Sequence, residues 1–160
     1  MSIAVDQTRL RRIVERVAPG VSLSRVEGET ILQIAQLAAG ADNESQPQEH
    51  MMLQAIAQQV GATAGLELGE LFLIPKVPDE GARAARLQRL ANQLGTKGTR
   101  ELAYTFAFLV SIADLELVPS ETKALEEFQF ALGVTHRRAM DLVVMLSEII
   151  EGGRERRPYA

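Results

Sequence analysis

The stretch Ile34–Thr63, IAQLAAGADNESQPQEHMMLQAIAQQVGAT, returns later in the chain in a similar form. Phe106–Thr135 reads FAFLVSIADLELVPSETKALEEFQFALGVT and aligns with the first stretch, without a gap, at an offset of 72 positions. The identical pairs are Ala35/Ala107, Leu37/Leu109, Ala41/Ala113, Asp42/Asp114, Glu44/Glu116, Pro47/Pro119, Glu49/Glu121, Leu53/Leu125, Gly61/Gly133 and Thr63/Thr135. Because these pairs include acidic residues and a proline, apolar periodicity alone does not explain them. We interpret the two stretches as copies of one unit.

Apolar residues recur at the spacing of an α-helix in both copies and around them. Helices are expected over residues 6–17, 24–41, 47–61, 79–94, 99–113, 119–133 and 135–152, with a further short buried helix over 66–74. The sequence therefore predicts an all-α fold, a single bundle of about seven helices. Its two helical hairpins, residues 25–63 and 97–135, are expected to be related by a pseudo-twofold axis. The domain is expected to span residues 1–152, and the basic residues 153–160 to form a flexible tail.

Helix ends are marked by residues with a known local role. Asp6 and Thr135 precede apolar helical patterns and are expected to be N-caps. Ser24-Arg-Val-Glu27 has the pattern of a capping box, in which each side chain accepts a backbone N–H group of the other residue. Gly61 and Gly133 are expected to end helices, and Gly95-Thr-Lys-Gly98 to form a turn.

Composition restricts the classes of function. The chain has 160 residues, no cysteine, two histidines and a formal net charge of −4. Disulfides, thiolate metal sites and a cysteine nucleophile are therefore excluded, and the acidic balance argues against nucleic-acid binding. The N-terminus does not resemble a signal peptide, and no apolar run approaches the length of a membrane span. We expect a cytoplasmic protein.

The pattern Ala-Asp-x-Glu-x-x-Pro-x-Glu, found between two apolar helices at 41–49 and again at 113–121, resembles the TerB-like family of bacterial tellurite-resistance proteins. The same domain type occurs at the start of some membrane-anchored J-domain co-chaperones. The family string is Ala-Asp-Gly, and here Asn43 and Leu115 occupy the glycine position. The resemblance covers roughly residues 25–151. It implies an all-helical cytoplasmic protein of the stress response to tellurium oxyanions, or of membrane-proximal complexes, with divalent-metal binding at the acidic turns.

The acidic residues of the two turns have two interpretations. The local interpretation is structural, since a Glu in the first helical turn accepts backbone N–H groups and an Asp in a tight turn bonds the chain nearby. The functional interpretation is a shared site for Ca²⁺, Mg²⁺, Mn²⁺ or Zn²⁺, because clustered oxygen ligands suit such cations. The candidate ligands are Asp42, Glu44, Glu49, Asp114, Glu116 and Glu121. His50, beside Glu49, is a candidate nitrogen ligand but is expected to be a half-exposed helical residue.

The alternative function is an interaction module without metal. Phe106, Phe108, Phe128 and Phe130 are too many large apolar residues to be buried on one face of each helix, so a protein partner or self-association is expected. Two arginine stripes, Arg9/Arg12/Arg16 and Arg83/Arg86/Arg89, are expected to be solvated faces, or else to dock an anionic membrane surface. We find no nucleophile–base pattern, phosphate loop or dinucleotide fingerprint, and therefore do not expect an enzyme and identify no small-molecule substrate.

Overall fold

The computed structural model describes residues 5–39, 47–65, 80–113 and 119–152, and they form seven α-helices. The helices are α1 Gln7–Val17, α2 Arg25–Ala39, α3 Pro47–Ala64, α4 Glu80–Asn92, α5 Lys97–Ser111, α6 Pro119–Ala131 and α7 His136–Gly152. The described residues contain no strand. The predicted all-α bundle is confirmed.

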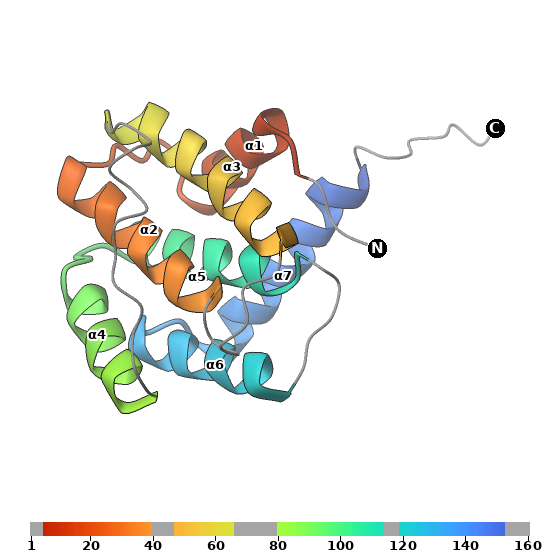
Figure 1. Ribbon diagram of the computed structural model, residues 1–160. Coiled ribbons are helices and arrows are strands. Elements are labelled where there is room, and N and C mark those ends of the chain that lie inside the picture. The colour runs from red at the N-terminus through yellow and green to blue at the C-terminus, as the bar shows by residue number, and fades with distance from the viewer. Residues whose placement is uncertain (1–4, 40–46, 66–79, 114–118, 153–160) are drawn as a thin grey trace.

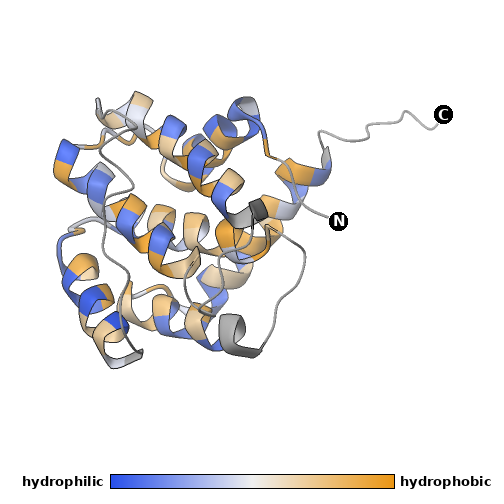
Figure 2. Cartoon of the chain, in the orientation of Figure 1, coloured by the Kyte–Doolittle hydropathy of each residue, from blue (hydrophilic) through white to orange (hydrophobic). Residues whose placement is uncertain are grey.

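The helices lie in three layers (Figure 1). α2 and α5 pack against each other in the middle layer, α1 and α3 form the layer above, and α4 and α6 form the layer below. α5 is the most buried of the described helices: eleven of its fifteen residues are buried, and the hydrophobic colours predominate along its C-terminal half (Figure 2). Leu102, Phe106 and Leu109 are fully buried, and they meet Ile31 and Ile34 of α2 in the same apolar core.

The internal repeat is visible in the packing of the helices. The first copy places α3 against α1 and α2, and the second places α6 against α4 and α5. The contacts between the copies also come in pairs: α1 packs on α5 as α4 packs on α2, and α3 packs on α5 as α6 packs on α2. α7 is the additional helix, and it packs on α1. This paired arrangement agrees with the predicted pseudo-twofold relation.

The repeated unit is larger than the predicted hairpin, because it includes a helix before each hairpin. Residues 9–17 of α1 read RLRRIVERV, and residues 86–94 at the end of α4 read RLQRLANQL. The two segments have the same burial class at all nine positions. Their offset is 77 positions rather than 72, so an ungapped alignment of the hairpins does not reveal them. The segment between α1 and α2 is five residues longer than the segment between the equivalent part of α4 and α5.

The predicted helix caps are confirmed. The Asp6 carboxylate accepts the backbone N–H of Arg9 at 2.8 Å, and the Thr135 hydroxyl accepts that of Arg138 at 3.1 Å. Ser24 and Glu27 form both bonds of the capping box, at 2.9 and 3.1 Å. These bonds satisfy backbone donors that the first helical turn leaves without a partner.

Two predicted helix boundaries are wrong. α3 does not end at Gly61 but continues to Ala64, and the left-handed residue that ends it is Gly65, with φ of 71°. In the second copy α6 ends at Ala131, and the equivalent glycine, Gly133, follows two residues later with φ of 69°. α5 begins at Lys97 rather than Thr99, because the hydroxyl of Thr96 caps it by accepting the backbone N–H of Thr99 at 3.2 Å. The short helix predicted over 66–74 lies outside the described residues.

No helix in the described ranges has both the length and the apolar content to cross a membrane.

The four phenylalanines differ in burial, as the sequence predicts. Phe106 and Phe128 are fully buried, Phe108 is partly buried, and Phe130 is 87% exposed.

Phe128 and Phe130 are two residues apart on α6 and should respond oppositely to truncation. Phe128→Ala is expected to lower the free energy of unfolding by about 3–5 kcal/mol, because it opens a cavity in the core. Phe130→Ala is expected to change it by less than about 0.5 kcal/mol, because the ring is exposed. Urea denaturation monitored by circular dichroism measures both values. Equal losses for the two variants would contradict the burial described here.

Candidate functional site

The two hairpins that carry the acidic turns point the same way. In Figure 1, α2 and α5 both run from left to right, and α3 and α6 both return from right to left. The helix ends that flank the two turns, the C-terminal ends of α2 and α5 and the N-terminal ends of α3 and α6, therefore face the same side of the molecule. This is the arrangement that a site shared between the turns would need.

The carboxylates predicted to bind metal are mostly outside the described part of the chain. Asp42, Glu44, Asp114 and Glu116 fall in 40–46 and 114–118, which are not described. Glu49 and Glu121 are the third residues of α3 and α6, and the description of these two residues stops at their helical backbone. Within the described residues, no group of three or more His, Asp or Glu side chains is placed to hold a metal ion. The metal site stays a prediction.

His50 is exposed on α3, which is the structural interpretation expected for it. The arginine stripes are not uniformly solvated. Arg83 is buried, and its guanidinium lies 3.5 Å from the Glu127 carboxylate of α6. Arg9 lies 3.6 Å from Asp6.

Arg16 lies 3.8 Å from Glu148, and Arg12 and Arg89 are exposed. The expectation that both stripes are solvated faces is therefore wrong at Arg83, because α6 covers its side chain and supplies a carboxylate. The membrane-docking alternative stays a prediction.

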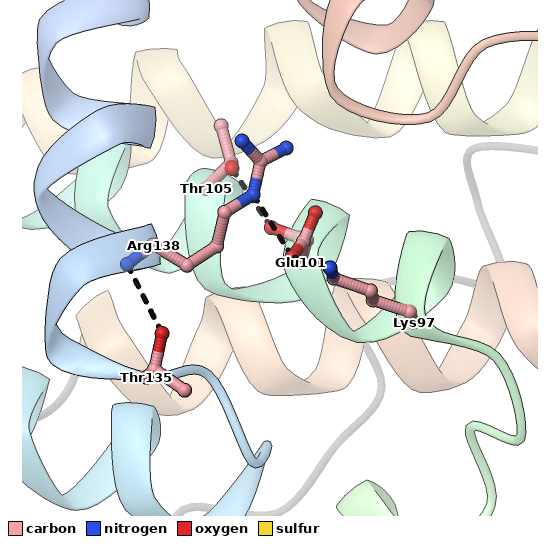
Figure 3. Close-up of polar contacts among 5 residues, drawn as sticks. All are labelled: Lys97, Glu101, Thr105, Thr135 and Arg138. Carbon is pink, nitrogen blue, oxygen red and sulfur yellow. Dashed lines mark hydrogen bonds and ion pairs between the residues drawn. The ribbon is translucent and has the colours of Figure 1, made fainter.

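A buried carboxylate that sequence reasoning did not single out joins α5 to α7. The side chain of Glu101 is only 5% exposed and accepts a hydrogen bond from Nε of Arg138 at 2.9 Å. The ammonium of Lys97, one turn earlier on α5, lies 3.9 Å from the same oxygen (Figure 3). The bond to Glu101 is the main reason why the pKa of Arg138 is raised above its ordinary value. The cluster stabilises a buried charge, and its salt bridge leaves no uncompensated acid or base for chemistry.

The first copy contains the same pair in a different environment. Arg25 and Glu29 of α2 are equivalent to Lys97 and Glu101 at the offset of 72, and their side chains lie 3.2 Å apart. The Glu29 side chain is 40% exposed, eight times the value for Glu101. The difference arises because α7 supplies Arg138 to the second copy. The repeated i,i+4 charge pair was visible in the sequence, but its burial depends on a helix far away in the chain.

Phe130 is the most exposed of the large apolar residues that the structure describes. It lies near the end of α6, on a face that also presents the exposed Glu126 one turn earlier. Its equivalent in the first copy is Gln58, which is also exposed and accepts a hydrogen bond from Nε2 of Gln7 at 3.1 Å. The same position of the fold thus accommodates a polar residue in one copy and an aromatic residue in the other.

A shallow hollow of about 730 Å³ lies between α1 and α3. Its lining mixes the charged side chains of Arg11 and Glu15 with the amides of Gln7 and Gln59 and with small or apolar residues. Glu15 is the one carboxylate in this lining, and the hydroxyl of Thr63, which also lines it, donates a hydrogen bond to the backbone carbonyl of Gln59 at 3.0 Å.

Burial affects one further titratable group of α5. Desolvation raises the pKa of Tyr104 above the ordinary value for tyrosine. Tyr104 is 5% exposed and belongs to the core rather than to a surface site.

Comparisons of the chain with models of protein families, with curated proteins and with solved structures give no match. The resemblance to the TerB-like family consequently still depends on the residues of the two acidic turns.

The two cations near Glu101 should differ in their contribution to stability. Arg138→Ala is expected to lower the free energy of unfolding by about 1–3 kcal/mol, because a buried carboxylate loses its charged hydrogen-bond donor. Lys97→Ala is expected to cost less than about 0.5 kcal/mol, since this side chain is 82% exposed and its ion pair is long.

A double-mutant cycle with Glu101→Gln, measured by urea denaturation, checks the assignment. The cost of Arg138→Ala should fall once the charge of Glu101 is removed. If that cost is the same in the Glu101→Gln background, Arg138 acts through packing rather than through the ion pair.

Proposed function

We propose that this protein is a non-enzymatic, TerB-like interaction module that binds a protein partner through the surface around Phe130. The observation that carries the proposal is the 87% exposure of this aromatic ring on a well-defined helix. The ring keeps its apolar surface in contact with water in the free protein, and aromatic side chains are enriched in protein–protein interfaces relative to the rest of the surface. The resemblance suggests that this partner acts in the stress response to tellurium oxyanions.

The internal repeat supplies a control for this argument. If the fold required an aromatic residue at this position of the hairpin, the first copy would also carry one. Gln58 occupies the equivalent position and is exposed. An aromatic residue at this position is therefore not a requirement of the hairpin fold.

The surroundings of Phe130 indicate the chemistry of the partner. Glu126 is exposed one helical turn before it, so the surface combines an apolar ring with a carboxylate. A complementary partner would offer an apolar pocket bordered by a basic side chain. Burying the ring in such a pocket is worth about 1.5–3 kcal/mol, enough for a hot spot of binding.

The substitution Phe130→Gln, which copies the residue of the first copy, tests the proposal. The tagged wild-type protein and the variant are used to capture partners from the native host, and captured proteins are quantified by mass spectrometry. A partner specific to this surface should be reduced at least about tenfold by the variant. Met51→Gln is the matched control, because Met51 is 69% exposed on α3. The proposal fails if both variants capture the same proteins as the wild type.

We also propose, as a second candidate, that the two acidic turns bind a divalent cation. The supporting observation is the common direction of the hairpins, which brings the helix ends beside the two turns to one side of the molecule. Glu49 and Glu121 are in the first turns of α3 and α6, where helix N-termini meet this side. The ligands would be the oxygens of Asp42, Glu44, Glu49, Asp114, Glu116 and Glu121.

Thermal denaturation in the presence of Ca²⁺, Mg²⁺, Mn²⁺ or Zn²⁺ measures this binding. A cation that binds only the folded state should raise the Tm. At a cation concentration of one hundred times the Kd, binding should raise the free energy of unfolding by about 2.7 kcal/mol. The variant with Asp42→Asn and Asp114→Asn should lose this increase. A Tm that does not respond to any of the four cations would leave the carboxylates with the role of helix caps.

A further inference from the structure

The hollow between α1 and α3, the two helices of the upper layer in Figure 1, has a buried amide in its lining. Gln59 of α3 is only 8% exposed. Among the described residues no group bonds its side-chain amide, and the nearby Thr63 hydroxyl donates instead to the Gln59 backbone carbonyl, at 3.0 Å. A buried amide without a partner lowers stability, because its groups leave water without a replacement bond. The amide is therefore available to a molecule that occupies the hollow.

Two opposite charges of α1 belong to the same lining. Arg11 and Glu15 are both exposed and lie one helical turn apart. Arg9 and Arg16 of this helix have carboxylate partners, whereas in the described part of the chain neither Arg11 nor Glu15 has an ion-pair partner. Both charges are thus open to a ligand that carries a complementary pair of charges.

The second copy of the repeat has neutral side chains at the same two places. Arg11 and Glu15 are equivalent to Gln88 and Asn92 at the offset of 77 positions. In α4 these two side chains bond each other, with Nε2 of Gln88 donating to the Asn92 carbonyl oxygen at 3.1 Å. The repeated helix therefore does not require a pair of charges at these positions.

The shape of the hollow suits a small molecule. Its volume of about 730 Å³ is within the usual range for ligand sites, about 300–1,000 Å³. Val14, Ala18 and Val21 supply apolar lining. Gln7 connects the two helices beside it, because its Nε2 donates to the Ala55 carbonyl at 3.0 Å and also to the side chain of Gln58.

We infer that this hollow binds a free α-amino acid with a carboxamide side chain. The carboxylate of the ligand pairs with Arg11 and its ammonium with Glu15, since both ligand charges are attached at one carbon and the two protein groups are one turn apart. The carboxamide bonds the amide of Gln59, because each amide has both a donor and an acceptor. The methylene groups between them contact the apolar lining.

The combination of groups favours this class of ligand over simpler ones. A lone anion or cation would pair with only one of the two charges, and an apolar molecule would leave the Gln59 amide without a bond. The pairs with Arg11 and Glu15 are near the surface, so they contribute little each and weaken as salt is added. Binding is therefore weak and dependent on ionic strength.

A titration of the isotope-labelled full chain with L-glutamine, followed by amide chemical shifts in NMR, measures the Kd and locates the site. Saturable shifts should occur at the lining residues of α1 and α3. Glutaramate, which is glutamine without its α-amino group, and norvaline, which has no carboxamide, should each bind more weakly than glutamine.

Substitution of Gln59 tests the contact with the carboxamide. Gln59→Ala, which copies Ala131 of the second copy, should weaken glutamine binding about tenfold and leave norvaline binding unchanged. Gln54→Ala is the matched control, because Gln54 is exposed on α3 and outside the lining. It should leave both affinities unchanged.

Substitution of the two charges tests the contacts with the ligand's head. Arg11→Gln should weaken glutamine binding about threefold or more, and Arg12→Gln, on an exposed residue outside the lining, should not. Glu15→Gln should weaken glutamine binding by a similar factor but should not weaken glutaramate binding, because glutaramate has no ammonium group. These side chains are exposed, so the test does not depend on the folding of Gln59→Ala.

Three outcomes would overturn the inference. They are the absence of saturable shifts at the lining residues up to the solubility limit of glutamine, equal affinities of the wild type for glutamine and glutaramate, and equal effects of Arg11→Gln and Arg12→Gln. Circular dichroism establishes that each variant is folded. Phe130→Gln should leave glutamine binding unchanged, so this inference and the proposed partner surface can fail separately.

Discussion

The packing of α2 against α5 is the contact on which the rest of the structure depends. These two helices occupy the same place in the two copies, and each carries apolar residues around most of its circumference. A helix that is apolar on nearly all sides must be covered on nearly all sides. The outer helices supply this cover: α1 and α3 from above, and α4 and α6 from below. The three-layer arrangement therefore follows from the burial that α2 and α5 require.

α7 breaks the symmetry of the two copies. It brings Arg138 to Glu101, whereas the equivalent Glu29 meets only Arg25 of its own helix among the contacts described above. The same pair of residues is thus exposed in one copy and buried in the other. Phe130 and Gln58 differ in a similar way, with a hydrogen-bonded amide in one copy and an exposed ring in the other. The exposed ring of Phe130 and the buried pair of Glu101 and Arg138 are therefore both found where the copies differ.

Much of the fold could be predicted from the sequence because its signals are local. Apolar spacing indicated the helices, and the caps at Asp6, Ser24 and Thr135 depend on neighbouring residues only. Gly61 was misleading because a glycine can lie within a helix as well as end it, and the glycine with positive φ after α3 is Gly65. The duplication of α1 in α4 was missed because five additional residues shift its offset. The burial of Glu101 and Arg83 was missed because it depends on helices distant in the sequence. Four of the six predicted metal ligands lie outside the described residues, and that part of the candidate site stays a prediction.

The crossed contacts between the copies have a consequence for folding. α1 packs on α5 of the second copy, and α4 packs on α2 of the first. Neither α1–α3 nor α4–α6 is thus a self-contained half. The central helix of each set, α2 or α5, depends on helices of the other set for part of its cover. The chain resembles two subunits of a dimer joined into one polypeptide. Its two halves should consequently unfold together in one cooperative transition, although they are consecutive segments of the sequence.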